Sequence, residues 1–263
     1  MIRKAIIQGL ITASVFIVVW FAIGQVNWLG VLKIEKTKNN LEEKLGRIFY
    51  DLFRNSEEEI DNINIKNTLD SLFSVISTKN GIENDIKIHI LRSDEINAFA
   101  LPDRHMIINT GLIEASGNQQ ELCGVICHEL AHIESGHVMK KLIKEMGLNV
   151  LVSMTSGGGT ETIKKAAGIL SSTAYDRSLE EEADRIAVDY LINAGIDAKP
   201  FASFLYTALN TRNQAAALSW ISTHPDAEER AMDILEYCSN QSSETILPVS
   251  EATWQALKTD ISR

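Results

Sequence analysis

The sequence predicts an α+β protein, mostly helical with one small sheet, that follows an apolar helix at the amino terminus. Three observations predict this fold class. Long segments repeat apolar residues at a spacing of three or four, as amphipathic helices do. Residues 86–111 contain short extended segments instead. The third observation is that the stretch Ala5–Val26 carries no charge. Several helices around one small sheet are typical of an α+β domain.

The amino-terminal segment Ala5–Val26 predicts a membrane-spanning helix. Its 22 residues would extend roughly 33 Å as a helix, enough to cross a hydrocarbon layer of about 30 Å. Arg3 and Lys4 precede it, and the positive-inside rule then keeps the amino terminus in the cytoplasm. Residues 30–263 are therefore expected on the other side of the membrane.

A cleaved signal peptide is the alternative for this segment, and Ala22–Gly24 resembles a small-residue cleavage site. The apolar run is longer than the core of most signal peptides, which favours an uncleaved anchor. Either way we expect two parts, a membrane anchor or signal segment in residues 1–29 and one folded domain in residues 30–263.

Composition excludes some function classes. The net charge is −10 and no long basic run is present, so nucleic acid is not an expected partner. Three cysteines give no disulfide framework. Cys123 and Cys127 fall one helical turn apart, and we expect them to be buried small groups rather than a bridge or extra metal ligands.

The first elements of the domain follow from apolar spacing. Residues 31–55 and 60–78 predict two amphipathic helices, and residues 86–91 predict a half-buried strand. Residues 97–111 predict two extended segments joined by a turn at Pro102-Asp103.

Capping signatures predict the next two helices. Asn118 followed by Glu121 indicates the start of a helix that carries the stretch CHELAHIESGH. Ser178 followed by Glu181 repeats the signature, and Gly195 is the expected end of that second helix.

The stretch CHELAHIESGH contains a zinc-binding pattern. His128 and His132 are four residues apart, so a helix places both imidazoles on one face, where both can reach one metal ion at about 2.1 Å. Glu129 lies about 100° around the helix, well placed beside a metal-bound water. This is the H-E-x-x-H arrangement of zinc hydrolases, and it requires a third ligand.

Two candidates exist for the third ligand. His137 would face away from His132 on a continuing helix, so we interpret it as a solvated histidine or one that contacts a ligand. Glu180 and Asp184 share one face of the second helix. Glu180 would complete the zinc site, and Asp184 would accept the free N–H of a ligating histidine.

With these motifs the chain resembles the HtpX/BepA/LoiP type of zinc metallopeptidase, a family that includes the CAAX prenyl proteases and a mitochondrial inner-membrane stress protease. That family pairs H-E-x-x-H with E-x-x-A-D, matched at residues 180–184. N-A-F and T-G-L are matched at residues 97–99 and 110–112, and T/S-H-P with a following arginine at residues 223–225 and Arg230. Asp103-Arg104 departs from the glycines common there, and Cys127 departs from the usual small residue.

The resemblance implies a zincin-like (gluzincin) fold and hydrolysis of peptide bonds with one Zn²⁺ per chain. Glu129 would take the proton of the metal-bound water and pass it to the departing amine. Asn97, Ala98 and Phe99 begin the extended segment 97–101, which either pairs with the substrate backbone as an added strand or is an ordinary sheet edge. The resemblance also implies polypeptide substrates, in particular unfolded or damaged envelope and membrane proteins.

One predicted span fits the periplasmic members of the family better than those with several spans. We therefore expect a single-pass protein of the bacterial inner membrane with its catalytic domain in the periplasm, or a secreted periplasmic protein if the segment is cleaved. A membrane-tethered chaperone or binding module with a structural zinc site is the alternative function. The sequence leaves self-association open.

Two further expectations concern the surroundings of the site. Pro225 suits the first turn of a helix, so His224 is expected at a helix mouth, with its ring either capping locally or turned into the cleft. In the cleft it would donate to the oxyanion or occupy the open position of the zinc.

Residues 153–168 contain three successive glycines and are expected to form a loop, either a mobile flap or a connector.

Overall fold

The computed structural model describes residues 34–83, 85–157, 159–210, 220, 222–239 and 245–262. The chain divides into two compact units, residues 1–41 and 42–263, and the sheet and the site lie in the second. The apolar segment Ala5–Val26, predicted to be an anchor or signal segment, lies outside the described residues. Within those residues, no helix is both long and apolar enough to span a membrane.

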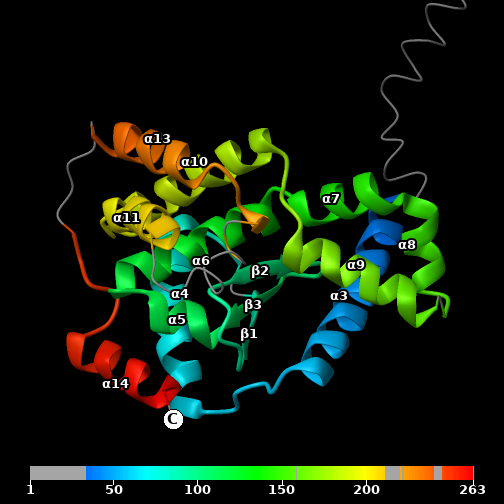
Figure 1. Ribbon diagram of the computed structural model, residues 1–263, viewed down its shortest axis with the longest axis horizontal. Coiled ribbons are helices and arrows are strands. Elements are labelled where there is room, and N and C mark those ends of the chain that lie inside the picture. Colours follow the sequence, from blue (N-terminus) through cyan, green and yellow to red (C-terminus); the bar gives the residue numbers. More distant parts are fainter. Residues whose placement is uncertain are drawn as a thin grey trace, which may run out of the picture. The chain divides into compact units, whose positions relative to one another are not determined.

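Helices dominate the described chain, and three short strands form its one sheet, which confirms the α+β prediction (Figure 1). The amino-terminal half contains α3 (Ile34–Ser56), α4 (Ile63–Asn80), β1 (Lys87–Leu91), β2 (Ala98–Leu101), β3 (His105–Asn109), α5 (Thr110–Ala115) and α6 (Gln119–Glu134). The remainder contains α7 (His137–Met146), α8 (Leu148–Met154), α9 (Thr160–Ser172), α10 (Arg177–Asn193), α11 (Lys199–Asn210), α13 (Ala227–Ser239) and α14 (Glu251–Ile261).

The sheet has the strand order β1-β3-β2, with β3 parallel to β1 and antiparallel to β2. The predicted hairpin between β2 and β3 is confirmed. Its turn holds Asp103 and Arg104 with φ of 60° each, a left-handed conformation for which glycine is the usual choice. The Arg104 guanidinium is fixed by ion pairs to Asp85 and Glu134. β2 is therefore one of the two edge strands of the sheet.

The T-G pair at the start of α5 binds the loop between β1 and β2. The hydroxyl of Thr110 donates to Ser93 O at 3.0 Å and accepts from Ser93 N–H at 3.1 Å. Gly111 N–H also donates to Ser93 O, at 2.8 Å. A Cβ at Gly111 would lie 2.5 Å from Asp94 O, so only glycine fits this approach.

Helix α6 is the central element, and it packs against β2, α4, α10 and α11 (Figure 1). It begins where the capping signature predicted, because Asn118 Oδ1 accepts from Glu121 N–H at 2.9 Å. The approach of α11 is close, since a Cβ at Gly124 would lie 2.4 Å from the Phe201 Cβ. Cys123 and Cys127 on α6 are free and buried, as predicted.

Other predicted boundaries are wrong. Helix α10 begins at Arg177 with Asp176 in the cap position, not at Ser178, although its end before Gly195 (φ 71°) is confirmed. The expected loop 153–168 is largely helical, because α9 covers residues 160–172 and only a short connection follows α8.

Candidate metal centre

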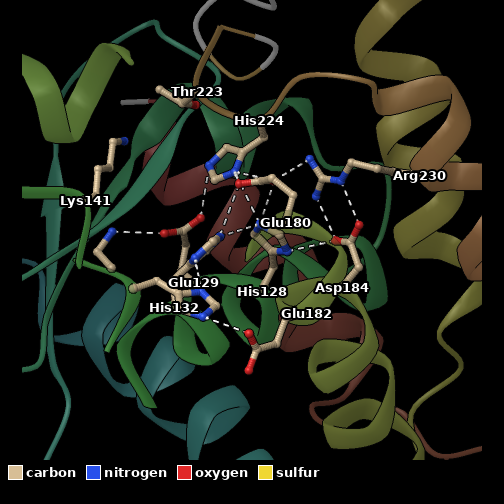
Figure 2. A network of polar contacts seen from close by, with 12 residues as sticks. His128, Glu129, His132, Lys141, Glu180, Glu182, Asp184, Thr223, His224 and Arg230 are labelled. Atoms are coloured by element: carbon tan, nitrogen blue, oxygen red, sulfur yellow. Dashed lines mark hydrogen bonds and ion pairs between the residues drawn. The ribbon is translucent and has the colours of Figure 1, made fainter. Parts of the chain in front are cut away.

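Helix α6 carries the first two residues of the site. His128 and His132 are fully buried and lie one turn apart, and their Nε2 atoms are 3.1 Å from each other (Figure 2). Such an approach of two ring nitrogens indicates a shared proton or a shared cation between them.

Glu180 and His224 complete the cluster from two other parts of the chain. Glu180, in the first turn of α10, places Oε2 3.5 Å from Nε2 of His128 and Oε1 3.4 Å from Nε2 of His132. Nδ1 of His224 lies 3.2 Å from Nε2 of His128 and 3.1 Å from both carboxylate oxygens of Glu180. All four donor atoms lie within 4.8 Å of one another.

The cluster fits a tetrahedral zinc ion. Bonds of about 2.1 Å at tetrahedral angles separate neighbouring donor atoms by about 3.4 Å. The donor separations given above lie between 3.1 and 3.5 Å. Two or three imidazoles with one carboxylate are also a donor set that zinc prefers.

Asp184 and Arg230 support the donors from behind. Asp184 Oδ1 lies 2.9 Å from Nδ1 of His128, and Nε2 of the same ring faces the cluster. The guanidinium of Arg230 donates to both oxygens of Asp184 at 2.7 Å, and its Nη1 lies 2.7 Å from Glu180 Oε2. The structure thus gives Asp184 the position that the sequence predicted, and it gives Arg230 a contact that the motif alone did not indicate.

The expectation that His137 faces away from His132 is wrong. Helix α6 ends at Glu134, and Gly136 with φ of 66° redirects the chain into α7. The His137 ring is therefore fully buried, with Nδ1 2.9 Å from Nδ1 of His132 and Nε2 3.4 Å from a Glu182 oxygen. Of the two interpretations of His137, contact with a candidate ligand is confirmed, and exposure to solvent is wrong.

Burial and neighbouring charges set the pKa values of the cluster. Burial lowers the pKa of His132 to about 4, which favours the neutral ring that binds metals. Burial also disfavours charge on His128, but hydrogen bonds to Asp184 and Glu180 outweigh it and raise that pKa to about 9. The carboxylates of Asp184 and Glu180 therefore favour a positive charge between them, carried by a proton on His128 or by a divalent cation. A bound cation would displace the proton. Burial would raise the pKa of Asp184, but the Arg230 guanidinium brings it down to about 2.

Glu129 lies beside the cluster, fully buried. Its Oε2 accepts from the backbone N–H of Ala100 at 2.9 Å, and its Oε1 lies 3.3 Å from Nε2 of His224. One carboxylate oxygen is thus fixed by the sheet, and the other points toward the donor atoms (Figure 2). A carboxylate held in this way can act as a base toward a water at the cluster.

In the predicted substrate segment, the residue that contacts Glu129 is Ala100 and not one of the three predicted residues, Asn97, Ala98 and Phe99. Asn97 Nδ2 donates to Ser171 O in α9 at 3.2 Å, and Phe99 packs against Phe53 of α3 at a ring distance of 4.9 Å. Ala98 is fully buried in the core. Ala100 is the residue of β2 that contacts Glu129. Helix α9 packs along β2, whose four residues are at most 5% exposed.

Two aromatic residues flank the imidazoles, and neither was predicted. Tyr175 stacks on His132 with ring centroids 4.0 Å apart, and Trp220 stacks on His224 at 4.1 Å. Trp220 and His224 are separated by one helical turn, since His224 N–H donates to Trp220 O. That i, i+4 spacing was a signal in the sequence, whereas the Tyr175 contact comes from tertiary packing. The predicted helix after Pro225 begins only at Ala227, and the His224 ring is turned into the cluster.

Comparisons with known proteins agree with this geometry. The model of peptidase family M48 matches residues 64–237. The putative beta-barrel assembly-enhancing protease of Vibrio cholerae is 26% identical over 207 residues, which cover 73% of this chain and 43% of that protein. Mitochondrial metalloendopeptidase OMA1 of Bos taurus is 28% identical over 55% of this chain and 31% of its own length. Metalloprotease YcaL of Escherichia coli is 28% identical over 59% of this chain and 62% of its own. The chain thus spans less than half the length of the beta-barrel assembly-enhancing proteases that it matches.

Proposed function

The chain belongs to peptidase family M48, and from this premise we propose that it is a zinc-dependent endopeptidase that hydrolyses unfolded or damaged envelope proteins. The observation that carries the proposal is the cluster of His128, His132, Glu180 and His224, with Glu129 held beside it. His128, His132 and Glu180 would hold the ion, and zinc when bound polarises a carbonyl and lowers the pKa of its water toward about 7.

The protein groups around the cluster have separate tasks in this reaction. Glu129 takes the proton of the attacking water and delivers it to the departing amine. The Ala100 N–H keeps the carboxylate oriented while it does so. Asp184 holds the His128 ring by its second nitrogen, and Arg230 holds Asp184 and Glu180 in place.

We propose that β2 binds the substrate as an added strand, which would recognise an extended backbone with little sequence preference. An unfolded chain offers such a backbone. Helix α9 packs against β2, and a substrate strand added there would have to displace it. Asn97→Ala removes the contact to Ser171 O and is expected to raise kcat/KM for unfolded casein. An unchanged or lower kcat/KM, with the fold intact by circular dichroism, would contradict this role for α9.

A tethered chaperone or binding module with a structural zinc site is the second candidate, and one observation favours it. The Nδ1 of His224 fills a fourth donor position, and closed four-ligand sites are typical of structural zinc. A structural site gives no reason for Glu129 to be buried between a sheet N–H and an imidazole. We therefore favour the peptidase.

Metal content and hydrolysis together test the proposal. The purified chain is expected to hold one zinc and to digest unfolded casein, and a chelator is expected to stop digestion. Glu180→Gln should lose zinc while the helix content is unchanged. Wild-type zinc content in Glu180→Gln would remove Glu180 from the ligands, and zinc binding without any digestion would favour the chaperone.

For the location of the protein, we propose a single-pass inner-membrane protein with residues 30–263 in the periplasm, or a secreted form if the amino-terminal segment is cleaved. The uncharged stretch Ala5–Val26 after Arg3 and Lys4 supports this topology. A reporter active only outside the cytoplasm, fused after Arg263, should be active. Activity of a cytoplasm-only reporter at the same junction would overturn the orientation.

A further inference from the structure

A buried lysine lies near the proposed metal site, and Glu129, Glu180 and Glu145 act on it electrostatically. Lys141 of α7 is only 4% exposed (Figure 2). Its ammonium donates to the carbonyl of Thr173 at 2.5 Å, and no carboxylate of the described residues forms an ion pair with it. Burying a charged lysine is unfavourable, and burial lowers the pKa of Lys141 to about 8. An apolar side chain would fill this space at a lower cost.

The Lys141 ammonium lies over the ring of Tyr175, 4.0 Å from its centroid. The His132 ring lies 4.0 Å from the same centroid at an interplanar angle of 17°. The ammonium and the imidazole thus both pack against the Tyr175 ring. Lys141, Tyr175 and His132 therefore form a continuous set of contacts, here called the stack, that ends at a donor atom of the metal site.

Each contact in this stack is attractive and directional. An ammonium over an aromatic face is a cation–π contact, which strengthens where water is excluded. Tyr175 is 7% exposed, and its ring shields one face of His132. Among the described residues, the other ring nitrogen of His132 faces the ring of His137 at 2.9 Å, whereas the corresponding nitrogen of His128 faces the Asp184 carboxylate. The orientation of His132 thus depends on the stack more than that of His128 does.

We propose that Tyr175 and Lys141 are positioning residues of the metal site. Tyr175 fixes the His132 ring by stacking, and the Lys141 ammonium holds the Tyr175 ring in place while carrying a positive charge beside the carboxylates of the site. The hydrogen bond from Lys141 to Thr173 O also ties α7 to the segment between α9 and α10, which carries Tyr175. This inference rests on the proposed metal site.

The test uses Co²⁺ in the full-length chain, because its visible absorption reports the ligand geometry and its dissociation constant is measured by competition with a chelator. Tyr175→Phe keeps the stack and is expected to bind Co²⁺ like the wild type. Tyr175→Leu removes the stack and is expected to weaken binding about tenfold, the low end for residues that hold a ligand. Its absorption bands should also shift.

For the charge, Lys141→Met keeps the length of the side chain and removes the ammonium. We expect shifted Co²⁺ bands and a kcat about tenfold lower with KM nearly unchanged, since the effect acts through His132 and not through substrate contacts. Lys141→Arg should restore the bands at least in part, and Lys140→Met on the exposed side of α7 should behave as wild type.

Unchanged Co²⁺ affinity and bands in folded Tyr175→Leu and Lys141→Met would overturn the proposal. If Tyr175→Leu does not fold, Tyr175→Met fills a similar volume without an aromatic face and decides in the same way. A wild-type chain that binds Co²⁺ normally but hydrolyses nothing overturns the proposed activity and leaves this inference standing. A wild-type chain that binds neither Co²⁺ nor Zn²⁺ overturns both.

Discussion

The backbone N–H of Ala100 donates to Oε2 of Glu129 at 2.9 Å and links the edge strand of the sheet to the base of the proposed reaction. The two residues come from β2 and α6, and both are buried. A substrate that pairs with β2 would therefore lie against the same strand that orients Glu129. If the proposed pairing with β2 occurs, substrate binding would act on the orientation of Glu129 through this hydrogen bond.

The first prediction follows from that contact. Glu129→Gln keeps an oxygen that can accept from Ala100 N–H but cannot take a proton, so turnover of casein should fall by at least about 10²-fold. Zinc content should stay at one per chain, because Glu129 is not among the proposed ligands. Glu145→Gln, an exposed change on α7, serves as the control. Substantial activity in Glu129→Gln would exclude Glu129 as the base.

The second prediction concerns the support of His128. Asp184→Asn loses the charge that faces both His128 Nδ1 and the Arg230 guanidinium. We expect zinc affinity to fall about 10–100-fold, as for other residues that orient a ligating histidine. Competition with a chelator measures the change, and Glu181→Gln on the exposed side of α10 is the control. Equal affinity in the two variants would reduce Asp184 to a structural partner of Arg230.

A third prediction concerns pH and a polar chain remote from the metal site. His105 Nδ1 and His89 Nε2 lie 2.8 Å apart, and His89 Nδ1 lies 3.0 Å from Glu59 Oε1. The Lys87 ammonium faces the other side of His105 at 3.4 Å. His89 must donate to Glu59, His105 to His89 and Lys87 to His105, so both imidazoles have to be neutral. A second proton on either ring would place two N–H donors against each other, at the contact between His89 and His105 or at that between Lys87 and His105.

Burial, with Lys87 as the next cause, lowers the pKa of His105 from 6.5 to about 4. Because this pKa is lower in the folded than in the unfolded chain, the unfolded chain binds more protons between these values, and stability falls as pH drops through them. Stability is unaffected by this group above about pH 6.5.

Urea unfolding of wild type and His105→Gln at pH 7 and at pH 5 measures the effect. The wild type should lose more stability between the two pH values, since glutamine can keep a neutral donor and acceptor but does not titrate in this range. Parallel losses in the two proteins would show that His105 is not the group responsible.

The sequence was sufficient for the parts of the site that depend on local spacing. His128 and His132 lie four apart on one helix, as do Glu180 and Asp184 on another, and helical geometry alone places each pair on one face. The prediction that the two pairs lie close together depended on the family resemblance, because spacing along a helix does not indicate which helices pack together.

Contacts between distant segments were not predictable from periodicity. Arg230 and Asp184 are 46 residues apart, and nothing local indicates their ion pair. The inward turn of His137 depends on Gly136, whose left-handed conformation separates the end of α6 at Glu134 from the start of α7 at His137. Likewise three glycines suggested a loop at 153–168, although the run from Thr160 has ordinary helix formers and folds as α9.

The last prediction concerns His224, for which the sequence left three roles open. Its Nδ1 lies 3.1–3.2 Å from donor atoms of Glu180 and His128, and its Nε2 lies 3.3 Å from Glu129 Oε1. The ring therefore lies between the Glu129 carboxylate and the donor atoms of Glu180 and His128, where it would exclude a water from the open position of a bound zinc. This position favours a resting ligand, so His224→Ala should keep zinc through three ligands and digest casein faster than wild type. An oxyanion donor predicts the opposite, a fall in kcat of about 10²–10³ with zinc retained. Turnover, zinc content and the melting temperature, measured together, separate these roles, since a purely capping residue would change only the last.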